Sequence, residues 1–225
     1  MMENNYYAQN LNAQKLFKVY ETKIPRVKQY LNAEISFVRD NLIGIERVLE
    51  LGAGYGRIVK ELAGNCKSIV GIDISDESVL LGKEYLKDNS NAEIMTMDVH
   101  NLTFEEKFDV ILCLQNGLSA MKATSPEFIE KILGMVVSGG KVYFSTYSEK
   151  FWEYRLMWFK EQAEKKLLGE LDLDKTKDGV IICKDGFKAI THTPKDLKMI
   201  GSLSGYEYQI QEVDESSVFL IIHKK

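Results

Sequence analysis

Short apolar runs alternate along this chain with stretches in which apolar side chains recur at helical spacing. The apolar runs predict strands, and the helical repeats between them predict helices. Strands that alternate with helices indicate a parallel sheet joined by crossover helices. The five runs that we expect as parallel strands are residues 47–51, 68–74, 92–97, 108–114 and 141–146.

Small polar residues mark where several helices begin. Ser75 precedes one helical repeat, the pair Ser125-Pro126 precedes a second, and Thr193-Pro194 precedes a third. Serine and threonine cap a helix N-terminus, and proline is tolerated at the first helical position. Gly139-Gly140 predicts a turn into the fifth strand. The last two runs, 206–211 and 217–223, are joined by a polar turn too short for a crossover helix, so we expect that pair to be antiparallel.

Two regions fall outside this alternation. Residues 1–43 show two amphipathic helical patterns separated at Pro25, which cannot continue the first helix. Residues 149–168 predict a helix rich in aromatic side chains, followed by short strands at 171–174, 180–183 and 187–191 around an Asp-Gly turn signal. We therefore expect an α/β fold: a Rossmann-like, seven-stranded, mostly parallel sheet with an antiparallel last strand, N-terminal helices, and a small α+β cap insertion after the fifth strand.

Glycines occupy every second position after the first expected strand, at Gly52, Gly54 and Gly56. Glycine allows both a positive φ and a close approach of the backbone to a ligand. A helical pattern resumes at Arg57. A strand, a glycine turn and a helix N-terminus together predict a nucleotide-type site at the carboxyl edge of a parallel sheet.

Acidic residues stand at the ends of three consecutive expected strands. Glu50 ends the first, Asp73 ends the second, and Asp98 follows the third. Because the carboxyl ends of parallel strands share one edge of the sheet, these carboxylates should line one crevice. Any one of them could cap a helix, but a carboxylate at the end of the second strand is also placed to accept both hydroxyls of a ribose.

The composition narrows the function classes. The chain has 225 residues, a net charge of −4 and 45% hydrophobic residues, which suits one globular domain and disfavours a nucleic-acid partner. The three cysteines are widely spaced without a CxxC pair, as expected of buried side chains in a reducing compartment. The polar start and the lack of a membrane-length apolar run lead us to expect a cytoplasmic protein.

Together these features resemble the class I S-adenosylmethionine-dependent methyltransferases. The resemblance covers residues 45–146 by motif and 194–225 by pattern. Its motifs are Glu50-Leu51-Gly52-Ala53-Gly54-Tyr55-Gly56, Gly71-Ile72-Asp73-Ile74-Ser75, Met97-Asp98-Val99, Phe108-Asp109-Val110-Ile111-Leu112-Cys113-Leu114 and Ser138-Gly139-Gly140-Lys141-Val142. Residues 24–31 also look like an uncharacterised branch of this family, which names no substrate.

The resemblance implies that S-adenosyl-L-methionine is the cofactor and that no metal is needed. The glycine loop would pass under the methionine part, and Glu50 would help hold its ammonium group. Asp73 would take the ribose hydroxyls, and Asp98 would bond the adenine amino group. The full set of implied cofactor residues is Glu50, Gly52, Ala53, Gly54, Gly56, Arg57, Asp73, Ile74, Asp98, Val99, Leu114, Gln115 and Asn116.

No single residue is marked as catalytic. A base is needed only if the acceptor must lose a proton. Candidates near the sheet edge are Tyr147, Asn116, Tyr20 and His192, each with a structural alternative. The candidates for acceptor binding are Tyr20, Tyr147, Trp152 and Arg155. The aromatic residues of 151–159 could also form a box for a cationic amine.

We divide the chain into an N-terminal helical cap (1–43), a cofactor-binding core (44–146), a cap insertion (147–193) and the end of the core (194–225). An enclosed cleft under these caps predicts a small-molecule acceptor and a monomer or homodimer. The alternatives are a protein or RNA methyltransferase, a non-catalytic S-adenosylmethionine-binding protein, and a NAD-binding oxidoreductase. Enzymes that methylate nucleic-acid amino groups are disfavoured, because Leu-Gln-Asn-Gly rather than Asn-Pro-Pro-Tyr follows the fourth strand.

Overall fold

The computed structural model describes residue 6 and residues 10–225. Within this part of the chain, seven strands form one sheet in the order β3-β2-β1-β4-β5-β9-β8. Their bounds are β1 Arg47–Leu51, β2 Ser68–Asp73, β3 Ala92–Thr96, β4 Phe108–Cys113, β5 Val136–Tyr147, β8 Glu207–Val213 and β9 Ser217–His223. Strands β1 to β5 are parallel, and β9 runs antiparallel to both β5 and β8. The expected fold class is confirmed.

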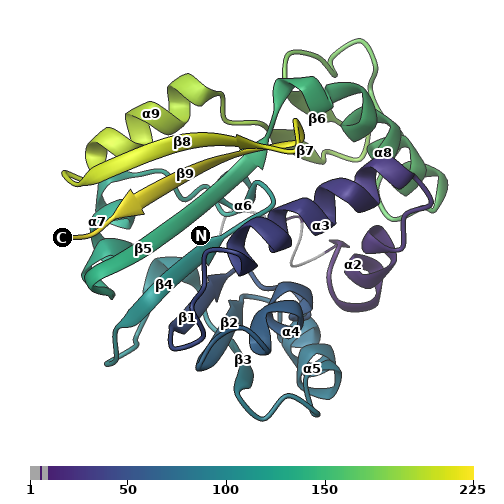
Figure 1. The fold of residues 1–225 in the computed structure, drawn as a ribbon. Coiled ribbons are helices and arrows are strands. Elements are labelled where there is room, and N and C mark those ends of the chain that lie inside the picture. Colours follow the sequence, from purple (N-terminus) through teal and green to yellow (C-terminus); the bar gives the residue numbers. More distant parts are fainter. Residues whose placement is uncertain (1–5, 7–9) are drawn as a thin grey trace.

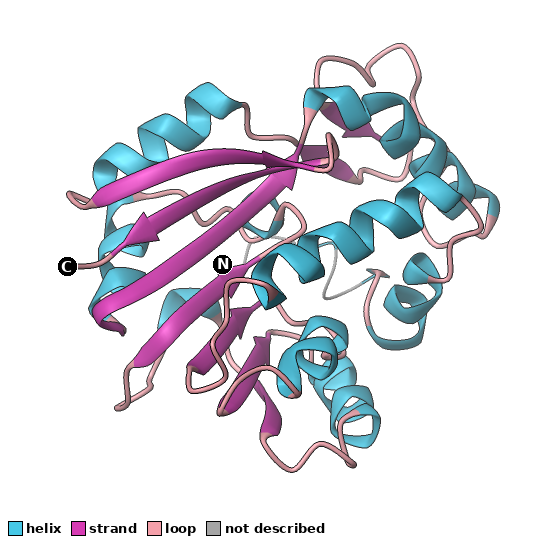
Figure 2. Cartoon of the chain, in the orientation of Figure 1, coloured by secondary structure: helices cyan, strands magenta, loops and turns pink. Residues whose placement is uncertain are grey.

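Helices cover both faces of the sheet (Figures 1 and 2). On one face, α7 (Pro126–Gly134) and α9 (Pro194–Leu203) pack on a cluster that includes Leu49, Ile111 and Phe144. On the other, α3 (Pro25–Arg39) and α4 (Arg57–Ala63) pack on Val48, Leu112 and Tyr143, and α5 (Asp76–Tyr85) joins the same cluster. Strand β4 is nearly continuous in apolar residues because both of its faces are covered.

The chain changes direction across the sheet at β1. From β1 it builds outward to β2 and β3, then returns to place β4 on the other side of β1. In open α/β sheets the ligand crevice forms outside the carboxyl ends of the strands at such a switch point. The glycine loop and the three acidic strand ends lie at this edge.

The expected turn at Gly139-Gly140 is instead part of a strand. β5 begins at Val136, which pairs with Phe108, and its register with β4 shifts between Phe108 and Val110. Gly139 has a φ of +81° and donates its N–H to the carbonyl of Lys224. The glycines therefore form a bulge, which keeps the strand paired while an extra stretch of backbone is accommodated.

The segment after β5 is less regular than expected. A 3₁₀ turn, Glu149–Phe151, leads into α8 (Trp152–Glu164), which is shorter than the predicted helix 149–168. Strands β6 (Val180–Ile182) and β7 (Lys188–Ile190) form the expected hairpin around Asp185-Gly186. The predicted strand 171–174 is wrong, because after one bridge from Leu171 to Cys183 the chain turns back on the carbonyl of Asp172.

At the N-terminal end, α2 (Ala13–Tyr20) and α3 are separate helices, and Pro25 is the first residue of α3, as the missing proline N–H allows. Tyr7 and most of residues 1–9 of the expected cap lie outside the described residues. The remaining short helices are η1 (Val99–Asn101) and α6 (Gly117–Ala120). No helix in the described part is long and apolar enough to cross a membrane.

Candidate functional site

The loop between β1 and α4 is held open by its glycines. Gly52, Gly54 and Gly56 have φ values of +72°, +57° and +82°, which only glycine adopts without strain. Ala53 donates its N–H to the carbonyl of Ile72 at 2.8 Å, and this bond fastens the loop to the end of β2. The loop therefore has one fixed path along the carboxyl edge of the sheet.

Asp73 lies at the centre of this edge. Its two carboxylate oxygens accept the N–H groups of Gly54 and Ser75, both at 2.9 Å. Burial raises the pKa of Asp73, and these backbone bonds oppose the rise. The β2–β3 register pairs Asp73 with Thr96, two residues before Asp98. Asp98 caps η1 by accepting the N–H of His100 at 2.9 Å.

Glu50 brings an unpaired carboxylate to the same edge. The residue is 3% exposed, and its Oε2 has no hydrogen-bond partner. Burial raises the pKa of Glu50 to about 8, the charge of Arg57 opposes the rise, and Asp73 adds to it. An ionised carboxylate in such surroundings is unfavourable unless a cation joins it. Glu50 is therefore suited to receive a positively charged ligand group.

Arg57, the first residue of α4, supplies the opposite charge. Its guanidinium carbon lies 4.5 Å from the ring centroid of Tyr20. Its Nε and Nη2 atoms are buried without a hydrogen-bond partner. Two parallel N–H donors of a guanidinium match a carboxylate. A buried carboxylate and a buried guanidinium, each with atoms that lack a hydrogen-bond partner, thus lie at the two ends of the loop sequence.

The end of β4 is strained and tied to its neighbours. Gln115 and Asn116 have φ values of +54° and +63°, uncommon for residues other than glycine. The N–H of Gln115 donates to Ser145 Oγ at 2.8 Å. Asn116 accepts from Thr146 Oγ1 and donates to the carbonyl of Ile190, both at 2.8 Å. Both ends of the Asn116 amide therefore hold the fold together, which favours the structural role for this candidate.

Helix α2 covers the glycine loop. Leu16 packs so closely on Gly54 that an added Cβ would lie 2.5 Å from its Cδ2. The ring of Phe17 lies 5.2 Å from that of Tyr55 within the loop. The N–H of Ala13 donates to Ser78 Oγ on α5 at 2.9 Å. A segment remote in sequence thus lies against the glycine loop at the carboxyl edge of the sheet.

Three of the four predicted acceptor-binding residues lie close together. The Arg155 guanidinium carbon is 4.5 Å from the ring of Tyr147 and 5.7 Å from that of Trp152. Arg155 is 1% exposed and donates to the carbonyl of Gly179 at 2.9 Å and to Thr191, which fastens α8 to the β6–β7 hairpin. The ring of Tyr20 lies 6.4 Å from that of Trp158, and it packs against the hydrophobic cluster that contains Trp158 and Tyr147.

The other candidates fall in three kinds of place. Four candidates lie in the loop between β1 and α4: Gly52, Ala53, Gly54 and Gly56. Among the apolar candidates, Ile74 is 41% exposed, whereas Val99 and Leu114 are buried. His192 lies in the loop between β7 and α9, and burial lowers its pKa, which favours a neutral imidazole.

Sequence reasoning missed Glu34. It is 0% exposed on the inner face of α3, in line with the apolar residues Tyr30 and Val38. An acid at the centre of an apolar helix stripe was the available signal, because glutamate is almost never fully buried without a partner.

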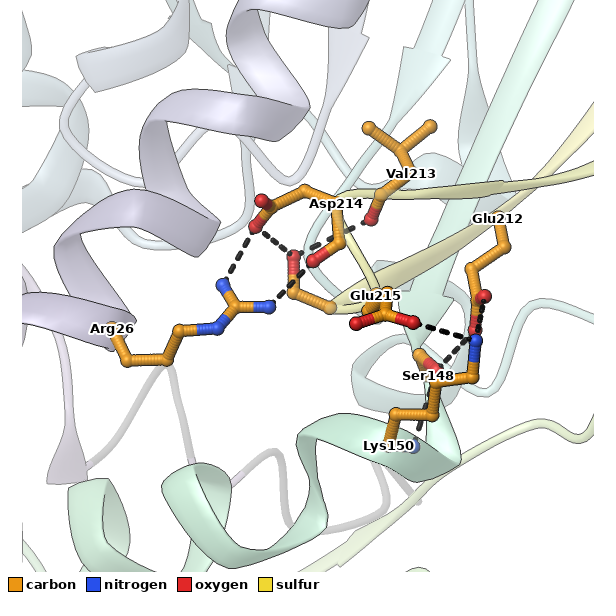
Figure 3. A network of polar contacts seen from close by, with 8 residues as sticks. Arg26, Ser148, Lys150, Glu212, Val213, Asp214 and Glu215 are labelled. Atoms are coloured by element: carbon orange, nitrogen blue, oxygen red, sulfur yellow. Dashed lines mark hydrogen bonds and ion pairs between the residues drawn. The ribbon is translucent and has the colours of Figure 1, made fainter.

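Helix α3 is fixed in place by a polar network at its N-terminal end (Figure 3). Arg26 pairs with Asp214 at 2.6 Å, in the turn between β8 and β9. On the other side of this turn, Lys150 reaches Glu212 at 2.7 Å and Glu215 at 3.0 Å. Exposed pairs contribute little singly, but networks contribute more. The network joins α3, the β8–β9 turn and the start of the α8 segment.

Residues 48–140 match the family model described as a methyltransferase domain. This match supports the resemblance to the class I S-adenosylmethionine-dependent methyltransferases. The match spans the glycine loop, the three acidic strand ends and β4, so the family resemblance is carried by the crevice just described.

Curated relatives of this chain include ubiquinone biosynthesis O-methyltransferases. The one from Coxiella burnetii is 26% identical over 111 residues, which cover 48% of this chain and 47% of that protein. The one from Hydrogenovibrio crunogenus is 22% identical over 161 residues, 70% of this chain and 62% of that protein. The chain thus spans about half the length of the first of these relatives and less than two thirds of the second.

Solved structures share the fold over nearly the whole chain. The DhpI–SAM–HEP complex superposes with a TM-score of 0.64 and 18% identity, covering 96% of this chain and 93% of that one. The N-methyltransferase NodS from Bradyrhizobium japonicum, in complex with S-adenosylhomocysteine, gives a TM-score of 0.56 and 15% identity, covering 99% of each chain. At these identities the likeness concerns the fold.

Proposed function

We propose that this protein transfers a methyl group from S-adenosyl-L-methionine to a small-molecule acceptor by in-line displacement. The observation that carries the proposal is the pair of unmatched charges beside the glycine loop. Glu50 Oε2 and Arg57 Nε and Nη2 are buried without partners. An α-amino acid end offers an ammonium for the first and a carboxylate for the second. When bound, S-adenosylmethionine supplies an electrophilic methyl group on a sulfonium.

The remaining crevice residues fit the adenosine part. Each carboxylate oxygen of Asp73 accepts a hydrogen bond from one backbone N–H. These bonds fix its orientation and leave further lone pairs for two ribose hydroxyls. Asp98, whose carboxylate accepts from the N–H of His100 and the side-chain amide of Asn101, would bond the adenine amino group. The apolar side chains of Ile74 and Val99 would lie against the ring.

The orientation of the two reactants would supply much of the rate acceleration. Holding the nucleophile, the methyl carbon and the sulfur in line can lower the activation barrier by about 7–11 kcal/mol. The buried Tyr147, Trp158 and Arg155 enclose the acceptor side. This enclosure favours a small molecule over a protein or RNA. The names of the curated O-methyltransferases and of the N-methyltransferase NodS support an acceptor that offers oxygen or nitrogen.

In this proposal, residues 1–43 and 147–193 form the two caps over a core of 44–146 and 194–225. The contacts of α2 with the glycine loop and of Arg155 with the β6–β7 hairpin support that division. We also propose a cytoplasmic monomer or homodimer, in line with the sequence-based expectation.

Calorimetry with S-adenosylhomocysteine and with NAD is the first test. We expect binding of the former alone, and tight NAD binding alone would replace this function with an oxidoreductase. The second test follows S-adenosylhomocysteine release over a panel of phenols, alcohols and amines. Turnover of a protein or RNA substrate but of no small molecule would contradict the acceptor class, and cofactor binding without any turnover would favour a binding protein.

A further inference from the structure

Glu34 is a carboxylic acid enclosed inside the protein, with the hydroxyls of Tyr30, Ser145 and Ser217 close to it. It is 0% exposed, and neither of its carboxylate oxygens makes a hydrogen bond of good geometry. The Tyr30 and Ser217 hydroxyls near it are likewise buried without a partner. A buried acid in this state weakens the fold relative to an apolar or amide side chain. The cost points to a role in function.

Groups from six elements lie around this carboxyl or interact with its neighbours. Arg57 is the nearby positive charge, and it also interacts with the carboxyl of Glu50. The remaining groups are hydroxyls. The titratable and polar groups around Glu34 and its neighbour Arg57 are Tyr30 of α3, Ser145 and Tyr147 of β5, Ser217 of β9, Arg57 of α4, Tyr20 of α2 and Glu50 of β1.

A single side chain, that of Ser145, lies between Glu34 and the end of β4, which would face the reactive methyl group. Ser145, whose hydroxyl lies beside Glu34, accepts the N–H of Gln115 at 2.8 Å. On the acceptor side, the ring of Tyr30 lies 5.4 Å from that of Tyr147. Glu34 therefore lies between the cofactor crevice and the proposed acceptor space.

The tyrosines of this space are poor bases at neutral pH. Burial raises the pKa of Tyr20 to about 12 and raises the pKa of Tyr147. Burial also raises the pKa of Glu34, to about 7, while the neighbouring hydroxyls and Arg57 oppose the rise. A group that exchanges its proton near neutral pH is suited to general acid–base catalysis.

Resting on the function proposed above, we propose that Glu34 receives the proton that the acceptor loses on methylation, so that the acceptor is a hydroxyl compound or a protonated amine. The acceptor oxygen or nitrogen forms its bond to the methyl carbon as the carbon–sulfur bond breaks, and that electron pair stays on sulfur. The O–H or N–H proton passes to the Glu34 carboxylate. The sulfonium charge and the carboxylate charge disappear together, so the enclosed space keeps its net charge.

This charge balance gives a test that needs no acceptor. S-adenosylmethionine carries the sulfonium, whereas S-adenosylhomocysteine is neutral at sulfur. Binding of the former should ionise Glu34 and release a proton, and binding of the latter should leave it protonated. Calorimetry in buffers of different ionisation enthalpy, between pH 6 and 8, counts the protons released per ligand bound.

In the wild-type protein we expect S-adenosylmethionine to release more protons than S-adenosylhomocysteine. Glu34→Gln should remove up to about one proton of that difference, and the dependence of affinity on pH should flatten by up to about tenfold per pH unit. Glu46→Gln is the matched control. Glu46 is also a buried acid, but it accepts the N–H groups of Ile43, Gly44 and Ile45 beside the start of β1, and its replacement should leave the proton count unchanged.

An equal proton difference in wild type and Glu34→Gln overturns the assignment, while failure of the wild type to bind either ligand overturns the proposed function instead. If Glu34→Gln does not fold, infrared spectra of the wild type decide. A protonated-carboxyl band lost with S-adenosylmethionine but kept with S-adenosylhomocysteine supports the role, and a band that both ligands leave unchanged overturns it. With any acceptor that the panel identifies, turnover of Glu34→Gln should fall about 100-fold or more while its affinity for S-adenosylhomocysteine is kept.

Discussion

The guanidinium carbon of Arg57 lies 4.5 Å from the centre of the Tyr20 ring. This contact joins α2 to the first residue of α4, directly beyond the glycine loop. The aromatic face holds the guanidinium while leaving its Nε and Nη2 without hydrogen-bond partners. Tyr20, which belongs to the helix over the glycine loop, therefore orients the guanidinium that would bind the carboxylate of the ligand.

Replacing Tyr20 with alanine should weaken binding of S-adenosylhomocysteine about threefold to tenfold, because the cation–π contact that orients Arg57 contributes about 0.5–2 kcal/mol. Tyr20→Phe keeps the ring and should bind nearly as the wild type does. Isothermal titration of the three proteins compares them directly. A phenylalanine variant as weak as the alanine variant would assign the effect to the hydroxyl and contradict the ring's role.

Asp73→Ala should weaken cofactor binding by at least about tenfold, since it removes charge-assisted bonds to the ribose worth about 1.5–3 kcal/mol. The same change releases the N–H groups of Gly54 and Ser75. Titration with S-adenosylhomocysteine measures the loss, and circular dichroism checks the fold. A folded variant with unchanged affinity would refute the ribose role.

Gly54→Ala should destabilise the protein by about 1–3 kcal/mol, because a side chain at a φ of +57° is strained and its Cβ would meet Leu16. Gly64→Ala is the matched control, as this glycine has a φ of −72° and no atom lies within 4 Å of the place that an added methyl group would occupy. Thermal denaturation should separate the two variants. Equal melting temperatures would show that the loop accommodates a side chain.

The ligand-free protein should lose stability as pH rises from about 5 to 8. Burial raises the pKa of Glu34 from 4.5 to about 7 and that of Glu50 to about 8. The folded state therefore holds protons that the unfolded state has already released. The stability that this proton binding contributes is present in full at low pH, and it is lost as pH rises through the raised pKa values of the folded state. For Glu34 alone the loss is about 2–3 kcal/mol.

Urea denaturation at pH 5 and pH 8 measures this slope. Glu34→Gln removes one of the two titrating groups, so its stability should depend less on pH and exceed that of the wild type at pH 8. The same slope in both proteins would mean that Glu34 is not held protonated by its surroundings.

Local sequence was sufficient for much of the fold. Ser75, Ser125 and Thr193 cap helices where the sequence predicts them, because capping depends on residues only a few positions apart. β1 has its predicted bounds. The sequence predicts a turn at Gly139, but the pairing of this segment with β4 and the bond to Lys224 make it a bulge, and neither partner is near it in sequence.

The sequence by itself determined the crevice: the glycine loop after β1 and the acids Glu50, Asp73 and Asp98 at the ends of consecutive strands, because parallel strands bring their carboxyl ends to one edge. Tertiary structure alone decided what encloses that crevice. It placed Tyr20 on Arg57, used both ends of the Asn116 amide in the framework, and buried Glu34 beside Ser145. These relationships join segments far apart in the chain, so they depend on packing that no local pattern records.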